Sequence, residues 1–108
     1  MTLTGTSDKD IIFSAGPAAT LTGNGGSDTF VFAIDNGGIA HITDFNIADD
    51  FLQISHTLFA SVDALLEQAH DDGNGNTVIT TAAQGSLVLN SVDATTFQSI
   101  DHSHIIIV

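Results

Sequence analysis

The sequence predicts a mainly β protein with one short helix, and three observations point to this fold class. Glycine-rich turns that end in an aspartate and lead into short apolar strands occur twice near the N-terminus. Several later segments alternate apolar with other residues, which is typical of half-buried strands. Only residues 61–70 carry apolar side chains at helical spacing over more than one turn.

The repeat is clearest in residues 21–32, Leu-Thr-Gly-Asn-Gly-Gly-Ser-Asp-Thr-Phe-Val-Phe. An earlier version fills residues 3–12, and Asp10 precedes Asp28 by 18 residues. Eighteen residues are two nonapeptides. A nonapeptide of glycines followed by an aspartate and an apolar residue is the calcium-binding repeat of a known class of stacked β-structures.

The nonapeptide between these two copies, residues 14–21, has the spacing of the repeat but lacks its aspartate. Leu21 occupies its apolar position, but Ala19 stands where the other copies have aspartate. Because turns 18 residues apart stack on the same edge when nonapeptides alternate between two sheets, we expect the turn that ends at Asp10 to lie over the turn that ends at Asp28. The middle turn is then expected on the opposite edge.

Both aspartate turns are predicted to bind calcium together. A calcium ion takes about 6–8 oxygen ligands, which glycine-rich turns supply as backbone carbonyls and aspartates supply as carboxylates. The predicted ligand residues are Gly5, Thr6, Asp8, Asp10, Gly23, Asn24, Gly26 and Asp28. Asp8 takes the place of a glycine, so it is either an extra ligand or a distortion of its turn. The alternative for each segment alone is an ordinary turn before a strand.

The charge of the chain agrees with cation binding. It has 13 acidic residues against one Lys and no Arg, which gives a formal net charge of −12. All of the acids but Glu67 are aspartates, the acid that favours turns and ligates calcium. With no basic patch, nucleic acids and anionic membrane surfaces are unlikely partners.

Other features narrow the function further. The chain has no Cys, so disulfide and thiol chemistry are excluded. The N-terminal residues do not form a secretory signal peptide, and no apolar run reaches the length of a membrane-spanning helix. Met1 is interpreted as an expression start, because the first repeat follows it directly.

The rest of the chain is predicted to form strands around one helix. The predicted strands are residues 30–34, 39–43, 51–55, 77–81, 86–90 and 104–108. The helix covers residues 61–70, with Ser61 as its N-cap and Val62, Leu65, Leu66 and Ala69 on one apolar face. Residues 93–97 are predicted to form a helical turn.

Three further aspartates are weaker candidates for metal ligands. Asp44 and Asp50 flank the loop between two predicted strands, where a turn or a second calcium site explains them. Asp72 begins an Asp-x-Asn-x-Asn pattern that is similar to a calcium loop. Thr77 and Ala83 stand where such a loop needs Gly and Glu, so a plain hairpin turn is favoured over a metal site.

No catalytic activity is predicted. The chain has no zinc-protease helix motif, no nucleophile-elbow motif and no cysteine nucleophile. His102 and His104 share one face of a predicted strand and could bind zinc or nickel. An exposed or hydrogen-bonded pair is favoured, because no third ligand lies nearby in the sequence.

The whole chain resembles the C-terminal region of RTX proteins, the hemolysin-type calcium-binding repeat proteins exported by bacterial type I systems, including serralysin-like proteases. One piece of the resemblance is the nonapeptide array. Another is residues 42–54, similar to the Ile-x-Asp-Phe segment after the repeats, with Ala48 in place of the usual Gly. The last is the apolar C-terminus, residues 105–108, where His104 replaces the expected acid.

The resemblance implies a short parallel β-roll over residues 1–31 and a β-rich cap with one helix over residues 32–108. It also implies that the module stays unfolded in a low-calcium cytosol and folds on calcium outside the cell. The implied partners are calcium, the type I secretion ABC exporter and an N-terminal passenger domain of a larger secreted protein. The apolar C-terminus would act as the secretion signal, as a core strand, or as both.

An extracellular adhesion or carbohydrate-binding β domain is the alternative function. Carbohydrate sites often use stacking aromatic side chains, but the chain has no Trp and no Tyr. Its seven Phe residues mostly occupy positions that read as core. We therefore rank this alternative below the calcium-binding module.

Overall fold

The computed structural model describes residues 2–13, 18–32, 38–56, 59–80 and 85–108. It is mainly β, as the sequence predicts. The strands are β1 (Thr2–Thr4), β2 (Ile11–Phe13), β3 (Ala18–Thr22), β4 (Thr29–Phe32), β5 (Ile39–Ile42), β6 (Phe51–Ile54), β7 (Ala69–Asp71), β8 (Thr77–Thr80), β9 (Ser86–Leu89) and β10 (Ile105–Ile107). The helices are α1 (Val62–Gln68), α2 (Ala94–Gln98) and the 3-10 helix η1 (His102–His104).

The strands of the described residues form two sheets. A six-stranded sheet has the order β1-β3-β5-β9-β8-β7, and a four-stranded sheet has the order β10-β6-β4-β2. From β1 to β6, consecutive strands therefore alternate between the two sheets. All neighbouring strands are parallel except in the β7-β8-β9 part, which is antiparallel.

The 18-residue repeat is also the pairing register of the first strands. Thr4 pairs with Thr22 in the six-stranded sheet, and Ile12 pairs with Phe30 in the four-stranded sheet. The next pairing has a longer offset, because Phe30 pairs with Leu52. Each aspartate turn joins a strand of one sheet to the following strand of the other.

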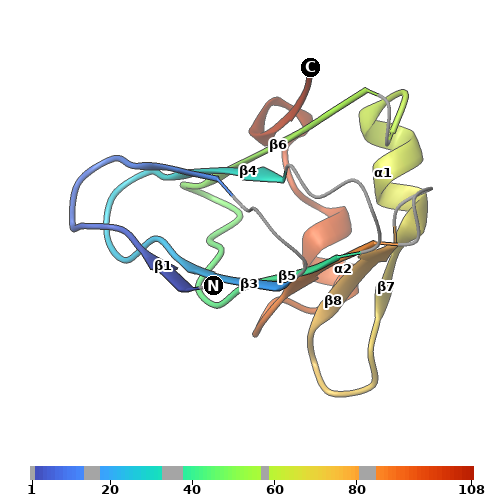
Figure 1. Ribbon diagram of the computed structural model, residues 1–108. Coiled ribbons are helices and arrows are strands. Elements are labelled where there is room, and N and C mark those ends of the chain that lie inside the picture. The colour runs from blue at the N-terminus through green and yellow to red at the C-terminus, as the bar shows by residue number, and fades with distance from the viewer. Residues whose placement is uncertain (1, 14–17, 33–37, 57–58, 81–84) are drawn as a thin grey trace.

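The two sheets form two layers with one hydrophobic core between them (Figure 1). Side chains alternate along each strand, so that Phe30 and Phe32 of β4 point inward and are buried. Helix α2 lies between the layers, away from the N-terminal turns (Figure 1), and its Phe97 ring stacks edge-on against Phe45 with centroids 6.4 Å apart. The buried apolar residues are Ile12, Ala19, Leu21, Phe30, Phe32, Ala40, Ile42, Phe45, Leu52, Ile54, Phe59, Leu65, Ala69, Ile79, Leu87, Leu89, Val92, Phe97, Ile100 and Ile105.

Helix α1 begins where the sequence predicts and ends earlier. The Ser61 side chain caps it by accepting a hydrogen bond from the Ala64 N–H over 3.1 Å. Leu65 is fully buried and Ala69 nearly so, which confirms the predicted apolar face. The prediction that the helix continues to residue 70 is wrong, because residues 69–71 form β7 and pair with β8. Pairing with a neighbouring strand outweighs helical periodicity at these last positions.

The predicted C-terminal strand begins one residue late. His104 ends the 3-10 helix η1, so it does not share a strand face with His102 as predicted. Its ring stacks on Phe51 at 4.5 Å, and its Nδ1 lies 2.8 Å from the Asp50 carbonyl oxygen. Strand β10 then pairs with β6, and Ile105 is buried in the core. The apolar C-terminus thus contributes a strand to the four-stranded sheet.

The other predicted elements agree closely where they are described. Strands predicted at 39–43, 51–55 and 86–90 are each one residue shorter. The helical turn predicted at 93–97 is α2, capped by the Asp93 side chain. The predicted turn of the middle nonapeptide falls on residues 14–17, outside the described part of the chain. The sheets draw strands from both sides of residue 31, and the predicted boundary between residues 31 and 32 stays a prediction.

Thr77 carries a buried hydrogen bond that holds the segment after β9. Its Oγ1 donates to the Val92 carbonyl oxygen over 2.6 Å, and the residue has no exposed surface. Thr77→Val keeps the shape but leaves that carbonyl unpaired, so we expect the free energy of unfolding to fall by about 1–3 kcal/mol. Urea denaturation measures it. The exposed Thr80 of the same strand is the matched control, and an equal loss in Thr80→Val would contradict this assignment.

In the described residues, no helix is long and apolar enough to cross a membrane.

Candidate metal centre: a stack of three acidic turns

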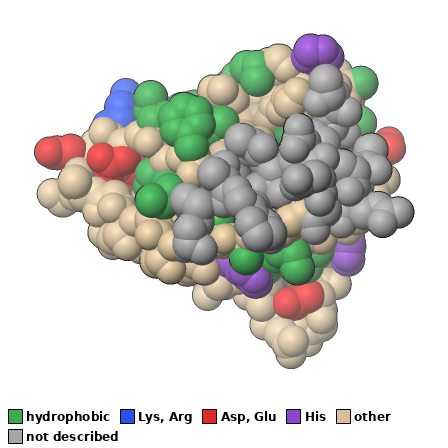
Figure 2. Space-filling model, viewed as in Figure 1, with side chains coloured by type: hydrophobic (Ala, Val, Ile, Leu, Met, Phe, Trp, Pro, Cys, Tyr) green, Lys and Arg blue, Asp and Glu red, His purple; other side chains and the backbone are tan. Residues whose placement is uncertain are grey.

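Three acidic turns lie one upon another at one edge of the two sheets. We call residues 5–10, 23–28 and 44–50 the turn stack. The first two turns form the left-hand tip of the molecule in Figure 1. Figure 2 shows acidic side chains gathered at this tip beside Lys9, the only basic side chain of the Lys/Arg type in the chain.

Two of the turns are closed by their own last aspartate. In the first turn, the Thr6 N–H donates to Asp10 Oδ2 over 2.6 Å. In the third turn, the Asn46 N–H donates to Asp50 Oδ2 over 2.9 Å. A carboxylate that accepts a backbone N–H four residues earlier fixes the turn without a regular helix or strand.

The same aspartates link each turn to the next. The Asp10 N–H donates to Asp28 Oδ1, and the Asp28 N–H donates to Asp50 Oδ1, both over 2.9 Å. Three carboxylates thus form a continuous column through the stack. Like charges so close together repel, and in the described residues no Lys or Arg side chain forms an ion pair that compensates them.

Asp44 connects the third turn to the second. Its two carboxylate oxygens accept hydrogen bonds from the Gly23 N–H (2.9 Å) and the Asn24 N–H (2.7 Å). The Asn24 side chain in turn donates to the Gly5 carbonyl oxygen over 2.9 Å. Asn24 adopts a left-handed backbone conformation (φ 65°), which asparagine tolerates better than most residues. All three turns are therefore connected at both of their ends.

Two glycines in the second turn are required by close contacts. A Cβ at Gly23 would collide with Asp28 Oδ2, so the glycine makes room for the carboxylate that folds back over it. Gly26 has a φ of +83°, and a Cβ there would lie 2.7 Å from the Asp8 backbone of the turn below. Gly5 is the counterpart of Gly23, with a virtual Cβ 2.5 Å from Asp10 Oδ2.

Asp28 is the least satisfied group of the stack. The residue has no exposed surface, and none of the described residues forms a hydrogen bond to its Oδ2. The Asn24 N–H, which would close this turn as the Thr6 N–H closes the first, donates to Asp44 instead. Burial raises the pKa of Asp28 above its ordinary value of 3.8, and the charges of Asp50, Asp10 and Asp44 raise it further. Burial also raises the pKa of Asp50.

These raised pKa values give the metal-free protein a specific pH dependence. Between the unfolded value near 3.8 and the raised folded value, the folded protein binds more protons than the unfolded chain. The free energy of unfolding should therefore fall as the pH rises through that window. Urea denaturation in chelator at a series of pH values measures this slope. A slope that is unchanged in Asp28→Asn would show that Asp28 is not its source.

The chemistry of the stack fits a hard divalent cation such as calcium. Its donors are carboxylate and backbone carbonyl oxygens, with no thiolate or imidazole. Asp28 Oδ2 is buried and accepts no hydrogen bond from the residues that the structure describes, and the other carboxylate oxygens keep lone pairs beyond the N–H bonds that they accept. In the described residues, no three His, Cys, Asp or Glu side chains are grouped as a metal site, so backbone carbonyls would have to supply further ligands.

The structure brings together the residues that were predicted as the main site. Gly23 and Asp28 are buried, and Asp10 is half-buried. Asp8 is exposed, and its N–H donates to Thr6 Oγ1 over 3.1 Å, so it does not break the turn. The predicted ligands from the first two turns are Gly5, Thr6, Asp8, Asp10, Gly23, Asn24, Gly26 and Asp28, and all belong to the turn stack.

Asp72 lies elsewhere, in the hairpin turn between β7 and β8. Its carboxylate accepts hydrogen bonds from the Asn74 N–H (2.7 Å) and the Asn76 side chain (3.0 Å). The bond from the Asn76 side chain is the main reason why the pKa of Asp72 is lowered. These contacts are those of the plain hairpin turn that the sequence favours.

The repeat pattern did not place Asp44 and Asp50 in the turn stack. Asp50 follows Asp28 by 22 residues, not 18, because the turn from 44 to 50 is longer and contains no glycine. The signal in the sequence was the apolar strand that follows each aspartate, since Phe51 aligns with Thr29 just as Thr29 aligns with Ile11.

Searches of the chain against protein-family models, curated proteins and solved structures found no match. The function is therefore inferred from the turn stack and from the motif residues themselves.

Proposed function

We propose that the chain is a calcium-binding module of the RTX type, in which a short β-roll folds when calcium enters the turn stack. Supporting this, strands β1 to β6 alternate between two sheets in which they pair in parallel, and glycine-aspartate turns stack at one edge in the 18-residue register. The donor atoms are the oxygens that calcium prefers. Residues 1–31 form the roll in this proposal, and residues 32–108 form its cap.

The buried Asp28 carboxylate is the observation that carries the proposal. An ionised carboxylate without exposure is costly unless a cation or several hydrogen bonds compensate it. Within the described part of the chain, Asp28 accepts one such bond, from the Asp10 N–H, and three acidic neighbours raise its pKa. A calcium ion beside Oδ2 would remove both the unpaired oxygen and the repulsion within the column.

The same column gives calcium control over folding. Without the cation, the repulsion among Asp10, Asp28 and Asp50 opposes closure of the stack, and the short strands β1 and β2 have little else to hold them. A ligand that binds only the folded state stabilises it, by about 2.7 kcal/mol for one site at 100 times Kd. Calcium thus shifts the balance toward the folded state, so the module is only marginally stable where calcium is scarce and is folded where it is abundant.

This behaviour suits export through a type I system. In the proposal the unfolded chain passes through an ABC exporter, with the apolar residues 105–108 as part of the signal, and folds on calcium outside a bacterial cell. It serves a larger secreted protein whose N-terminal domain carries the activity. Once folded, residues 105–107 are strand β10, paired with β6.

Circular dichroism with and without a chelator tests the proposal. We expect the β signal to increase when calcium is added, and we expect this increase to be lost in Asp28→Ala. The exposed aspartate Asp63, which lies on α1 away from the stack, gives the matched control Asp63→Ala, which should keep the response. An identical spectrum with and without chelator in the unaltered protein would overturn calcium-dependent folding.

A further inference from the structure

A pocket of about 400 Å³ lies at the third turn of the turn stack, between that turn and the segment that follows β9. This size is within the range of small-molecule sites, roughly 300–1,000 Å³. Its lining consists of Thr43, Asp44, Phe45, Asn46, Ile47, Asn90, Ser91, Val92, Asp93 and Thr96. We call it the polar pocket. None of the calcium ligands of the first two turns lines it.

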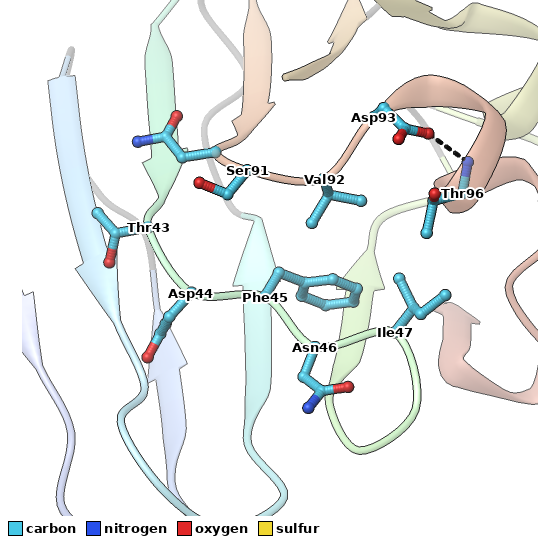
Figure 3. Close-up of a pocket in the computed structure, with 10 residues that line it drawn as sticks. Thr43, Asp44, Phe45, Asn46, Ile47, Ser91, Val92, Asp93 and Thr96 are labelled. Atoms are coloured by element: carbon cyan, nitrogen blue, oxygen red, sulfur yellow. Dashed lines mark hydrogen bonds between the residues drawn. The ribbon is translucent and has the colours of Figure 1, made fainter. Parts of the chain in front are cut away.

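The lining has two different sides. In Figure 3, Phe45, Ile47, Val92 and Thr96 point toward one another at one end, while Thr43, Asp44 and Ser91 lie at the other end. Phe45 and Val92 are almost fully buried, so they form an apolar floor and not an exposed patch. A ligand that matches both sides has an apolar face and a polar edge.

The charges of the lining exclude two classes of ligand. Two aspartates and no Lys, Arg or His line the pocket, so phosphates and carboxylates would be repelled. Most of the lining side chains carry oxygen, which disfavours a purely apolar ligand. Neutral hydroxylated molecules and cations remain.

The hydrogen bonds that the polar side chains of the lining already form distinguish a neutral hydroxylated ligand from a cation. Both Asp44 oxygens accept backbone N–H bonds, and Asp93 accepts the Thr96 N–H over 2.7 Å. By contrast, no hydrogen bond to the Asn90 carboxamide or the Ser91 hydroxyl is formed by the described residues. These two groups each donate and accept, as a hydroxyl ligand requires, whereas a cation needs acceptors alone.

The backbone at Ser91 is held in an uncommon conformation. Its φ is 63°, in the left-handed region where a non-glycine residue is uncommon. The Ser91 N–H donates to Asn76 Oδ1 over 2.8 Å, and the Thr77 hydroxyl holds the next carbonyl, that of Val92. The neighbouring hairpin thus fixes the segment that presents Asn90 and Ser91 at the pocket.

We propose that the polar pocket binds a saccharide unit, with the C–H face of the ring on Phe45 and Val92 and the ring hydroxyls bonded to Asn90 and Ser91. A pyranose ring has the required pair of surfaces, one apolar and one bearing hydroxyls that donate and accept. The site adds a ligand-binding activity to the module, and the two residues proposed to bond the ring hydroxyls, Asn90 and Ser91, lie outside the turn stack.

NMR titration of the full chain with four methyl glycosides, those of glucose, mannose, galactose and N-acetylglucosamine, tests the site. We expect at least one of them to shift amide resonances of residues 43–47 and 90–96 and to leave those of the β7–β8 turn unchanged. Spectra are recorded in calcium and again in chelator. Calcium-dependent folding changes resonances throughout the chain, whereas glycoside binding changes only those of the pocket, so the two proposals fail separately.

Two variants remove the groups that are free to bond. Asn90→Ala deletes the carboxamide, and Ser91→Gly deletes the hydroxyl while suiting the left-handed backbone, so that it should fold. We expect each to weaken glycoside binding about fivefold, the effect of one hydrogen bond. Asn74→Ala, in the exposed β7–β8 turn, is the control and should bind as the unaltered protein does.

Shifts confined to the pocket and weakened by both variants support the proposal. It is overturned if no glycoside shifts the pocket resonances in the folded protein, or if both variants bind unchanged. Calcium that shifts these resonances beyond the effect of folding, where no glycoside does, assigns the pocket to a cation and overturns it as well.

Discussion

Asp28→Asn is expected to make the calcium-free protein more stable than the unaltered chain and to abolish the stabilisation that calcium gives. The amide keeps the oxygen that accepts the Asp10 N–H and removes the buried charge that has no partner at Oδ2. In chelator at neutral pH, we expect the free energy of unfolding to rise by about 1–3 kcal/mol, because the variant ends the repulsion between this buried charge and Asp50, Asp10 and Asp44. In calcium at about 100 times Kd, the variant loses roughly 2.7 kcal/mol of linkage.

Urea denaturation with calcium and with chelator measures both effects. Asp63→Asn makes the same change of charge at an exposed site and should shift the two curves alike. If Asp28→Asn lowers the stability in chelator, or if it keeps the full calcium response, the Asp28 carboxylate is not the strained group that the turn stack presents.

Gly23→Ala is expected to destabilise the folded protein strongly. Its Cβ would collide with the Asp28 carboxylate and lie 2.9 Å from the Phe30 ring, and both are fully buried and cannot move aside. Overpacking of this kind costs about 1–3 kcal/mol, and the displaced carboxylate adds to it, so we expect a loss of about 3 kcal/mol or more.

Gly73→Ala is the control for this prediction, because it introduces backbone strain without a collision. Gly73 has a φ of +89° with no atom within 4 Å of a virtual Cβ, so alanine there costs only the left-handed backbone, about 1–2 kcal/mol. Urea denaturation compares the two variants. A cost at Gly23 no greater than that at Gly73 would mean that the second turn is not closed over its own aspartate.

The register of the first two turns could be predicted from the sequence, because close contacts in these turns require glycine and aspartate at particular positions. Gly23 must lack a Cβ, and Asp28 must accept the Asp10 N–H. The 18-residue offset between the two copies in the sequence is therefore also the offset between the turns that stack in the structure. The third turn has no such glycine. Asp50 reaches the column through a longer loop that Asn46 closes, and a fixed period cannot detect it.

Two other features, the polar pocket and the residue at which α1 ends, could not be predicted from the sequence for a different reason. Asn90 and Ser91 come close to Asp44 only because β9 pairs with β5, 47 residues away. Residues 69–71 continue a helical pattern, yet they leave the helix since β8 offers them a partner strand. Both outcomes depend on which strands meet, which short-range patterns do not determine.

Calorimetric titration of calcium into the unaltered protein and into Asp10→Ala and Asp28→Ala tests the central claim most directly. We expect the unaltered protein to bind calcium and both variants to lose binding at the same site, because the two turns are joined by the Asp10–Asp28 hydrogen bond. A stoichiometry above one would point to Asp44 and Asp50 as further ligands. No binding by the unaltered protein, or identical isotherms for all three proteins, would contradict the claim that the turn stack is a calcium site.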